Sequence, residues 1–281
     1  MEDEGICAGQ GARNKFVRLR FNSSSALVAA FLMISVCANA RGQSAGCEDI
    51  SQKIRQHVRE LEYTDEVAQA LIRMVNRWDN KKGIAFLTAR RKKLSQIRED
   101  YRQGRIEIAE VTKAERKMTE EIAWMLESEL GCSDNDFELV DVIKNKQASC
   151  LGFTQLFYIL GNSVGLSFTP ITVIEAQLPG PLPTGAAHVS CIAELSDGKT
   201  IMVSTVPGGF SISEPFVMDE EFTQVGNYWR LIDKDNPLQI CREIRVLDKN
   251  GLVAYIYTAT GERSKPSQGD STKQLQTSRE Q

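Results

Sequence analysis

The stretch between residues 47 and 130 contains no proline, and its apolar residues recur every three or four positions. The clearest case is one set of five apolar side chains: Val67, Leu71, Met74, Val75 and Trp78. This spacing lines up one face of an α-helix, and a chain without proline can continue a helix unbroken. We therefore predict a helical module over residues 47–131. Its later helices are expected over residues 84–103 and from residue 108 or 112 to residue 131.

Beyond Gly131 the pattern changes to short helices, strands and turns. A short helix is expected over residues 137–145 and a strongly apolar helix from Cys150 onward. Runs rich in Thr, Ile and Val then favour three strands, over residues 168–176, 188–195 and 200–206. The dipeptide at 197–198 is Asp-Gly, which is typical of a two-residue hairpin between antiparallel strands. The predicted fold class is therefore α+β, a helical segment followed by a helix packed on a small antiparallel sheet over residues 132–260.

The first forty residues have the three parts of a secretory signal peptide. Four basic residues lie between positions 13 and 20, an apolar run covers residues 26–37, and Ala-Asn-Ala follows at 38–40. The apolar run is shorter than the ~20 residues that cross a bilayer. We predict cleavage after residue 40 and export to the periplasm or the outside of the cell. An uncleaved anchor over residues 23–40 is the alternative. The polar tail, residues 261–281, is predicted to be disordered.

Composition excludes several classes of function. The formal net charge is -3, whereas a dedicated nucleic-acid binder carries a basic excess. The chain has 2 His, which excludes a His-rich metal site. It contains no Gly-rich phosphate loop and no Cys-x-x-Cys pair, so no cofactor or metal is implied. The expected partner is a peptide or a protein, and a membrane is contacted only through the N-terminal segment if that segment stays uncleaved.

Removal of residues 1–40 leaves an odd number of cysteines: Cys47, Cys132, Cys150, Cys191 and Cys241. In an oxidising compartment an odd number leaves at least one thiol unpaired, which is a small indication of a working thiol. The sequence does not fix which cysteines pair. For Cys191 we expect a packing role, because strict alternation turns it away from His188, and a disulfide is the alternative.

Two residues could carry chemistry. Ser149 is a good N-cap, so Cys150 falls in the first turn of its helix, where backbone N–H groups and the helix dipole favour a thiolate. The alternative is a small buried apolar residue. His188 opens a strand after a loop rich in Pro and Gly, where an imidazole can serve as the base for a nearby thiol. The alternative is a structural or surface histidine.

The order of these residues resembles the transglutaminase-like superfamily, which has papain-type Cys–His–Asp sites, and most of all its bacterial SirB-type branch. The resemblance covers residues 141–216, and four segments carry it: residues 141–150, 156–166, 188–195 and 202–209. It implies thiol acyl transfer on peptide or cell-envelope substrates, with Cys150 as nucleophile and His188 as general base. The family's third member is an Asp, and Ser204 takes its place here. Gln147 is a weak candidate to donate to an oxyanion, with a solvated loop residue as the alternative.

Because Ser204 stands where the family has an Asp, two functions of this site stay open. A carboxylate stabilises an imidazolium, whereas a hydroxyl only orients the ring. The chain is thus either a cysteine hydrolase or acyltransferase with a weakened site, or an inactive member of the fold that serves as a binding module. A structural envelope protein that works through its helical segment is a third reading.

Two polar features of the helical segment are expected to be surface features. The basic run Arg90–Lys93 is followed closely by acidic residues, which is typical of a solvated helix face, and a nucleic-acid or lipid contact is the alternative. His57 lies in a polar stretch and is predicted to be an exposed helix residue.

Overall fold

The computed structural model describes residues 49–78, 83–133, 135, 137–176, 188–206, 209–233 and 241–260. All of them belong to one compact unit, Glu48–Gln281. The predicted signal peptide, the polar tail and most of the loop before His188 lie outside the described residues. In the part of the chain that is described, we find no helix that is both long and apolar enough to cross a membrane.

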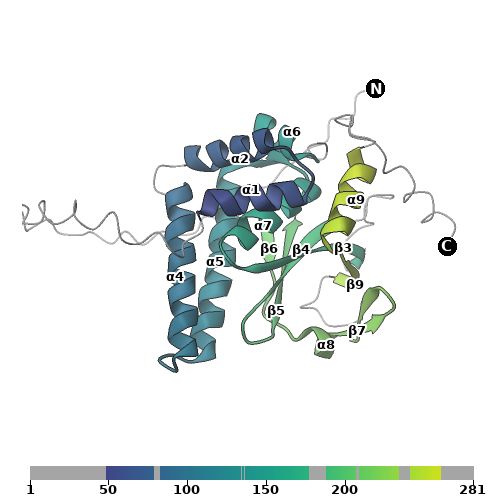
Figure 1. The fold of residues 1–281 in the computed structure, drawn as a ribbon. Helices are drawn as coiled ribbons and strands as arrows, with labels where there is room; N and C mark the ends of the chain where they lie inside the picture. The colour runs from purple at the N-terminus through teal and green to yellow at the C-terminus, as the bar shows by residue number, and fades with distance from the viewer. Residues whose placement is uncertain are drawn as a thin grey trace, which may run out of the picture. The chain divides into compact units, whose positions relative to one another are not determined.

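The helical segment is confirmed. Its described helices are α1 (Ile50–Glu60), α2 (Asp65–Arg77), α4 (Ile84–Arg102) and α5 (Ile108–Glu129). The last two match the predicted ranges closely and form a long antiparallel hairpin at one side of the unit (Figure 1). Helix α1 crosses the front of α7, and α2 lies above it (Figure 1).

The second half confirms the α+β class. Its described helices are α6 (Leu139–Asn145), α7 (Cys150–Ser163), α8 (Met218–Glu221) and α9 (Lys249–Thr260). Its strands are β1 (Gly131–Cys132), β2 (Gln147–Ala148), β3 (Ser167–Ala176), β4 (His188–Glu194), β5 (Thr200–Val206), β6 (Gly209–Ile212), β7 (Phe222–Val225), β8 (Tyr228–Leu231) and β9 (Cys241–Val246). Strands β1 and β2 form a short parallel pair. The others form one seven-stranded sheet in the order β6-β5-β4-β3-β9-β8-β7, with antiparallel neighbours throughout.

The hairpin between β4 and β5 forms where the Asp-Gly dipeptide predicts it. Gly198 has a φ of +82°, a conformation that glycine adopts without a steric penalty. The backbone N–H of Leu195 donates to Lys199 O at 2.8 Å and closes the turn, which therefore has three residues, 196–198, and not the predicted two. This hairpin fixes the register of the two strands, in which Cys191 pairs with Val203.

The sheet has two different faces. One face packs on α7, and its core continues without a break into α1, α2, α4, α5, α6 and α9. From β4 and β5 this face receives Val189, Cys191, Ala193, Ile201 and Val203. The opposite face carries a smaller cluster: Ile171, Val173, Met202, Phe216, Phe222, Leu231, Cys241 and Ile244. The helical segment and the α7 face of the sheet therefore share one core.

Helix α7 lies at the centre of this core. Residues 151–157 are all buried, and the two polar side chains among them, Thr154 and Gln155, donate hydrogen bonds to backbone carbonyls. Its C-terminal end approaches β3 closely, because a Cβ atom added at Gly161 would overlap the ring of Phe168. Only a glycine at position 161 allows this approach.

A buried carboxylate ties the α4–α5 hairpin to the sheet. Glu115 of α5, whose side chain is 1% exposed, accepts hydrogen bonds from Arg98 Nε at 3.0 Å and Nη2 at 2.6 Å. The backbone N–H of Ser196, in the β4–β5 turn, donates to the same carboxylate at 2.7 Å. Arg98 also donates to Gly165 O at 2.7 Å, just after α7. Glu115 and its partners thus link α4, α5, the β4–β5 turn and the residues just after α7. A buried carboxylate is tolerated when several donors bind it, as they do here.

Candidate functional site

Cys150 is the first residue of α7, and the predicted cap is present. The Ser149 hydroxyl accepts a hydrogen bond from the backbone N–H of Gly152 at 3.2 Å. The thiol is half-buried and forms no disulfide. Burial raises the pKa of Tyr255, and the charge of Cys150 raises it further, so α9 lies within electrostatic reach of this thiol. A helix N-terminus of this kind favours a thiolate.

His188 and Ser204 lie together, as the resemblance implies. His188 opens β4, Ser204 lies on β5, and Nε2 of the imidazole is 2.7 Å from Oγ of the hydroxyl. Removal from water lowers the pKa of His188 below its usual 6.5, because burial disfavours the charged imidazolium. The hydroxyl offers no negative charge to offset this effect. At neutral pH the pair is therefore a neutral imidazole bonded to a neutral hydroxyl.

The pleat of the sheet places this pair on the face opposite to α7. His188 is registered with Val173, whose side chain belongs to the smaller cluster on that face. Cys191 points the other way, and its thiol lies 3.6 Å from the Thr154 carbonyl of α7. The predicted alternation between Cys191 and His188 is thereby confirmed. His188 is turned away from the sheet face that α7 covers. This arrangement does not favour a contact between His188 and Cys150, and their pairing stays a prediction.

Gln147 belongs to β2 and pairs with Gly131 in the short parallel ladder. Its side chain is exposed and lies three positions before the start of α7. The proposed role of Gln147 as an oxyanion donor also stays a prediction.

The four described cysteines differ in accessibility, and all are free thiols. Cys191 and Cys241 are buried, and burial raises the pKa of both thiols, to about 12 for Cys241. Cys132 is exposed and pairs with Ala148 in the β1–β2 ladder. The expected packing role of Cys191 agrees with its complete burial. Cys132 and Cys150 are the two described thiols that a reagent in water can reach.

The prediction that His57 is exposed is wrong. Its side chain is 13% exposed, and its Nδ1 lies 2.8 Å from Glu60 Oε2. Tyr158 of α7 donates its hydroxyl to the same oxygen at 2.9 Å and meets the imidazole edge-on. The local sequence around His57 is polar and carries no sign of this contact, because Tyr158 comes from a distant part of the chain. The resulting Glu60–Tyr158 link holds α1 against α7.

The described residues contain no group of three or more His, Cys, Asp or Glu side chains that could hold a metal ion. Comparisons with protein-family models, with curated proteins and with solved structures find no match for this chain. The assignment of a function therefore depends on the geometry of Cys150, His188 and Ser204.

Proposed function

We propose that this chain is an exported protein with a transglutaminase-like domain that serves as a binding module rather than as a catalyst. The observation that carries the proposal is the bond between His188 and the Ser204 hydroxyl, on the sheet face turned away from α7. A papain-type site needs a thiolate beside an imidazolium, and a carboxylate usually supports that charge. Here the imidazole is desolvated and its one described partner is a hydroxyl.

The proposal of export comes from the N-terminal sequence. A basic segment, a short apolar run and a small-x-small site together support secretion. In that setting the module would meet peptide or protein partners of the cell envelope or its surroundings. No step of the proposal requires a cofactor.

A cysteine hydrolase or acyltransferase is the second candidate, and the cap of α7 is the observation in its favour. Cys150 lies in a capped first turn, where backbone N–H groups and the helix dipole favour a thiolate. In that reaction the Cys150 sulfur would attack an amide carbonyl and form a thioester while the C–N bond breaks. His188 would deliver the proton to the leaving amine, and water or a second amine would then release the acyl group.

The pH dependence of thiol alkylation separates the two candidates. Purified protein is treated with iodoacetamide between pH 5 and pH 9, and labelling at each cysteine is read by mass spectrometry. Exposed Cys132 is the internal control for thiol labelling at each pH, and buried Cys191 is the control for unfolding. The binding-module proposal predicts that Cys150 is labelled slowly at pH 6 and at the same rate in the His188→Ala variant.

Fast labelling of Cys150 at pH 6 that disappears in His188→Ala would contradict the proposal. That result would mean that the two side chains form a thiolate–imidazolium pair, and the search would then turn to amide substrates.

A further inference from the structure

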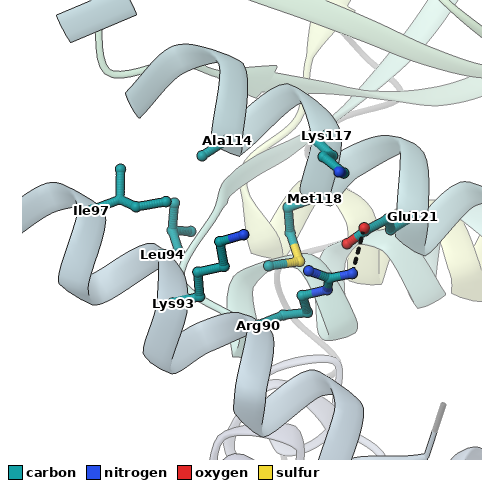
Figure 2. A pocket seen from close by; sticks show the side chains of 8 residues that line it. All are labelled: Arg90, Lys93, Leu94, Ile97, Ala114, Lys117, Met118 and Glu121. Atoms are coloured by element: carbon teal, nitrogen blue, oxygen red, sulfur yellow. Dashed lines mark hydrogen bonds and ion pairs between the residues drawn. The ribbon is translucent and has the colours of Figure 1, made fainter. Parts of the chain in front are cut away.

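Two surface features lie outside the proposed function: the basic run of α4 and the accessible thiols. In the basic run, Lys92 and Lys93 are exposed, as expected for a solvated helix face. Figure 2 shows Arg90 of this run reaching across to Glu121 of α5, with which it is paired at 2.6 Å. The recess between the two helices holds about 40 Å³, which is room for a few water molecules and too small for a peptide. The thiols carry a stronger inference.

The β1–β2 ladder brings the two accessible thiols near each other. Cys132 of β1 is registered with Ala148 of β2, two residues before Cys150. Registered residues of neighbouring strands project to the same side of a ladder. Ser149 is extended, with φ -77° and ψ 175°, so the alternation of side chains continues as far as Cys150. Cys132 and Cys150 therefore project to the same side, with the small Ala148 side chain beside them.

The separation of the two cysteines follows from the geometry of the ladder. Neighbouring strands lie about 4.8 Å apart and each residue advances about 3.3 Å, which places the Cα atoms of Cys132 and Cys150 about 8 Å apart. A disulfide needs about 4.4–6.8 Å between its Cα atoms, so a shift of about 1–2 Å brings the pair within range.

The hydrogen bonds of the ladder leave Cys132 room for this shift. The N–H of Gly131 donates to Lys146 O at 2.9 Å, and the N–H of Ser133 donates to Ala148 O at 3.0 Å. These two bonds hold the ladder on either side of Cys132. The Cys132 side chain is exposed, so its movement toward the start of α7 displaces water rather than core residues.

The other described thiols are poorly placed to compete. Cys191 and Cys241 are buried in separate clusters on opposite faces of the sheet. Burial raises the pKa of both thiols and so disfavours the thiolate that attacks in thiol–disulfide exchange. Cys191 contacts the carbonyl of Thr154, about 6 Å further along α7 than Cys150. Cys47 lies outside the described residues, and the experiment below includes it.

We propose that Cys132 and Cys150 form a reversible disulfide, which closes the thiol at the start of α7 when a disulfide oxidant is present. This proposal goes beyond the proposed binding function. It applies equally to a cysteine hydrolase or acyltransferase, because it concerns only the state of the Cys150 sulfur. It also assigns a pair among cysteines whose pairing the sequence leaves open.

The oxidant is a disulfide such as oxidised glutathione. The Cys150 thiolate, favoured at the helix N-terminus, attacks one sulfur of the oxidant, forms a mixed disulfide and releases one glutathione thiolate. The Cys132 thiolate then attacks the Cys150 sulfur and displaces the second glutathione. The two protein thiols lose two electrons and two protons in total, and these reduce one oxidised glutathione to two thiols.

The test is incubation of the reduced full chain with oxidised glutathione at pH 8, followed by N-ethylmaleimide to block the remaining thiols. Trypsin and chymotrypsin then digest the protein without a reductant, and mass spectrometry reads each cysteine. The second protease is needed because Cys150 and Cys191 lie on one tryptic peptide, residues 147–199. The test variant is Cys132→Ser, and Cys47→Ser is the matched control.

We expect a linked Cys132–Cys150 peptide in the unchanged protein and in Cys47→Ser, and its loss after treatment with dithiothreitol. In Cys132→Ser the second exchange step has no attacking thiol. The mixed disulfide of Cys150 with glutathione should therefore be at least about tenfold more abundant in this variant than in the unchanged protein. Equal melting temperatures of the reduced variants will show that both are folded.

Three results would overturn the proposal. One is a disulfide from Cys150 to Cys47 or Cys191 in place of the link to Cys132. Another is an equal amount of the glutathione adduct of Cys150 in the unchanged protein and in Cys132→Ser. The third is a Cys150 thiol that oxidised glutathione leaves unchanged and N-ethylmaleimide labels completely. None of these results alters the alkylation of Cys150 in the reduced protein, so this proposal and the proposed function fail separately.

Discussion

The face of the sheet under α7 and the face that carries His188 differ in what covers them. The first face is continuous with a core that includes six other helices, and the buried Glu115 carboxylate beside this core accepts several hydrogen bonds. The second face has a smaller cluster, and at its margin His188 is bonded to one hydroxyl. The comparison predicts that changes around Glu115 and α7 cost more stability than changes at the margin of the second face around His188.

The largest effect is expected from Glu115→Ala on the α7 side. This change leaves Arg98 and the Ser196 N–H without their shared acceptor and disconnects the α4–α5 hairpin from the β4–β5 turn. Removal of one partner from a buried ion pair costs about 3–5 kcal/mol. We expect the free energy of unfolding in urea to fall by this amount. Glu110→Ala, on an exposed position of the same helix, is the control and should cost less than about 1 kcal/mol. A loss at Glu115 no greater than at Glu110 would show that the network does not stabilise the fold.

A smaller loss is expected from Gly161→Ala, on the same side. The new methyl group would overlap the Phe168 ring, and overpacking of this kind costs about 1–3 kcal/mol. Gly251→Ala in α9 is the control, because its new Cβ would lie 3.2 Å from Asp248 Oδ1, the acceptor of the Gly251 N–H, so that a small shift of this side chain makes room and alanine favours a helix. Thermal unfolding should show a lower melting temperature for the first variant and little change for the second. A rise in melting temperature for Gly161→Ala would mean that α7 and β3 pack less tightly than described.

The smallest effect is expected on the second face and depends on pH. In the folded chain the pKa of His188 is below 6.5, so the unfolded chain binds more protons as the pH falls below 6.5. The contribution of neutral His188 to stability is therefore complete above pH 6.5 and is lost as the pH falls through its lowered pKa. We expect His188→Gln to flatten the dependence of unfolding free energy on pH between 6.5 and 5.5, by less than about 1.4 kcal/mol per pH unit. An unchanged dependence on pH would show that His188 is not desolvated.

Much of the fold could be predicted from the sequence because its signals are local. The spacing of apolar residues predicted α4 and α5, and the Asp-Gly dipeptide predicted the turn between β4 and β5. Ser149 predicted the cap of α7. The strands after β5 were not predicted, because short strands such as β7 and β8 carry little pattern.

The candidate site could be predicted only in part. The neighbourhood of His188 and Ser204 follows from the hairpin register, which the short turn at residues 196–198 fixes. The side of the sheet on which α7 lies relative to His188 depends on the packing of distant segments. The contact of His57 with Tyr158 is of the same kind, since no residue near His57 reports on it. Long-range packing of this kind leaves no local pattern in one sequence.

The most direct test of the separation between Cys150 and the His188–Ser204 pair is the Ser204→Asp variant. The new carboxylate would raise the pKa of His188, because a negative charge beside an imidazole favours the imidazolium. A Cys150 thiol in contact with that imidazolium would become more reactive. The measurement is the rate of Cys150 alkylation at pH 6 in Ser204→Asp and in the unchanged protein, with Cys132 as the internal reference. We predict rates within about twofold of each other, as for a thiol outside the reach of His188. An increase of tenfold or more would contradict the account and show that Cys150 and His188 are in contact.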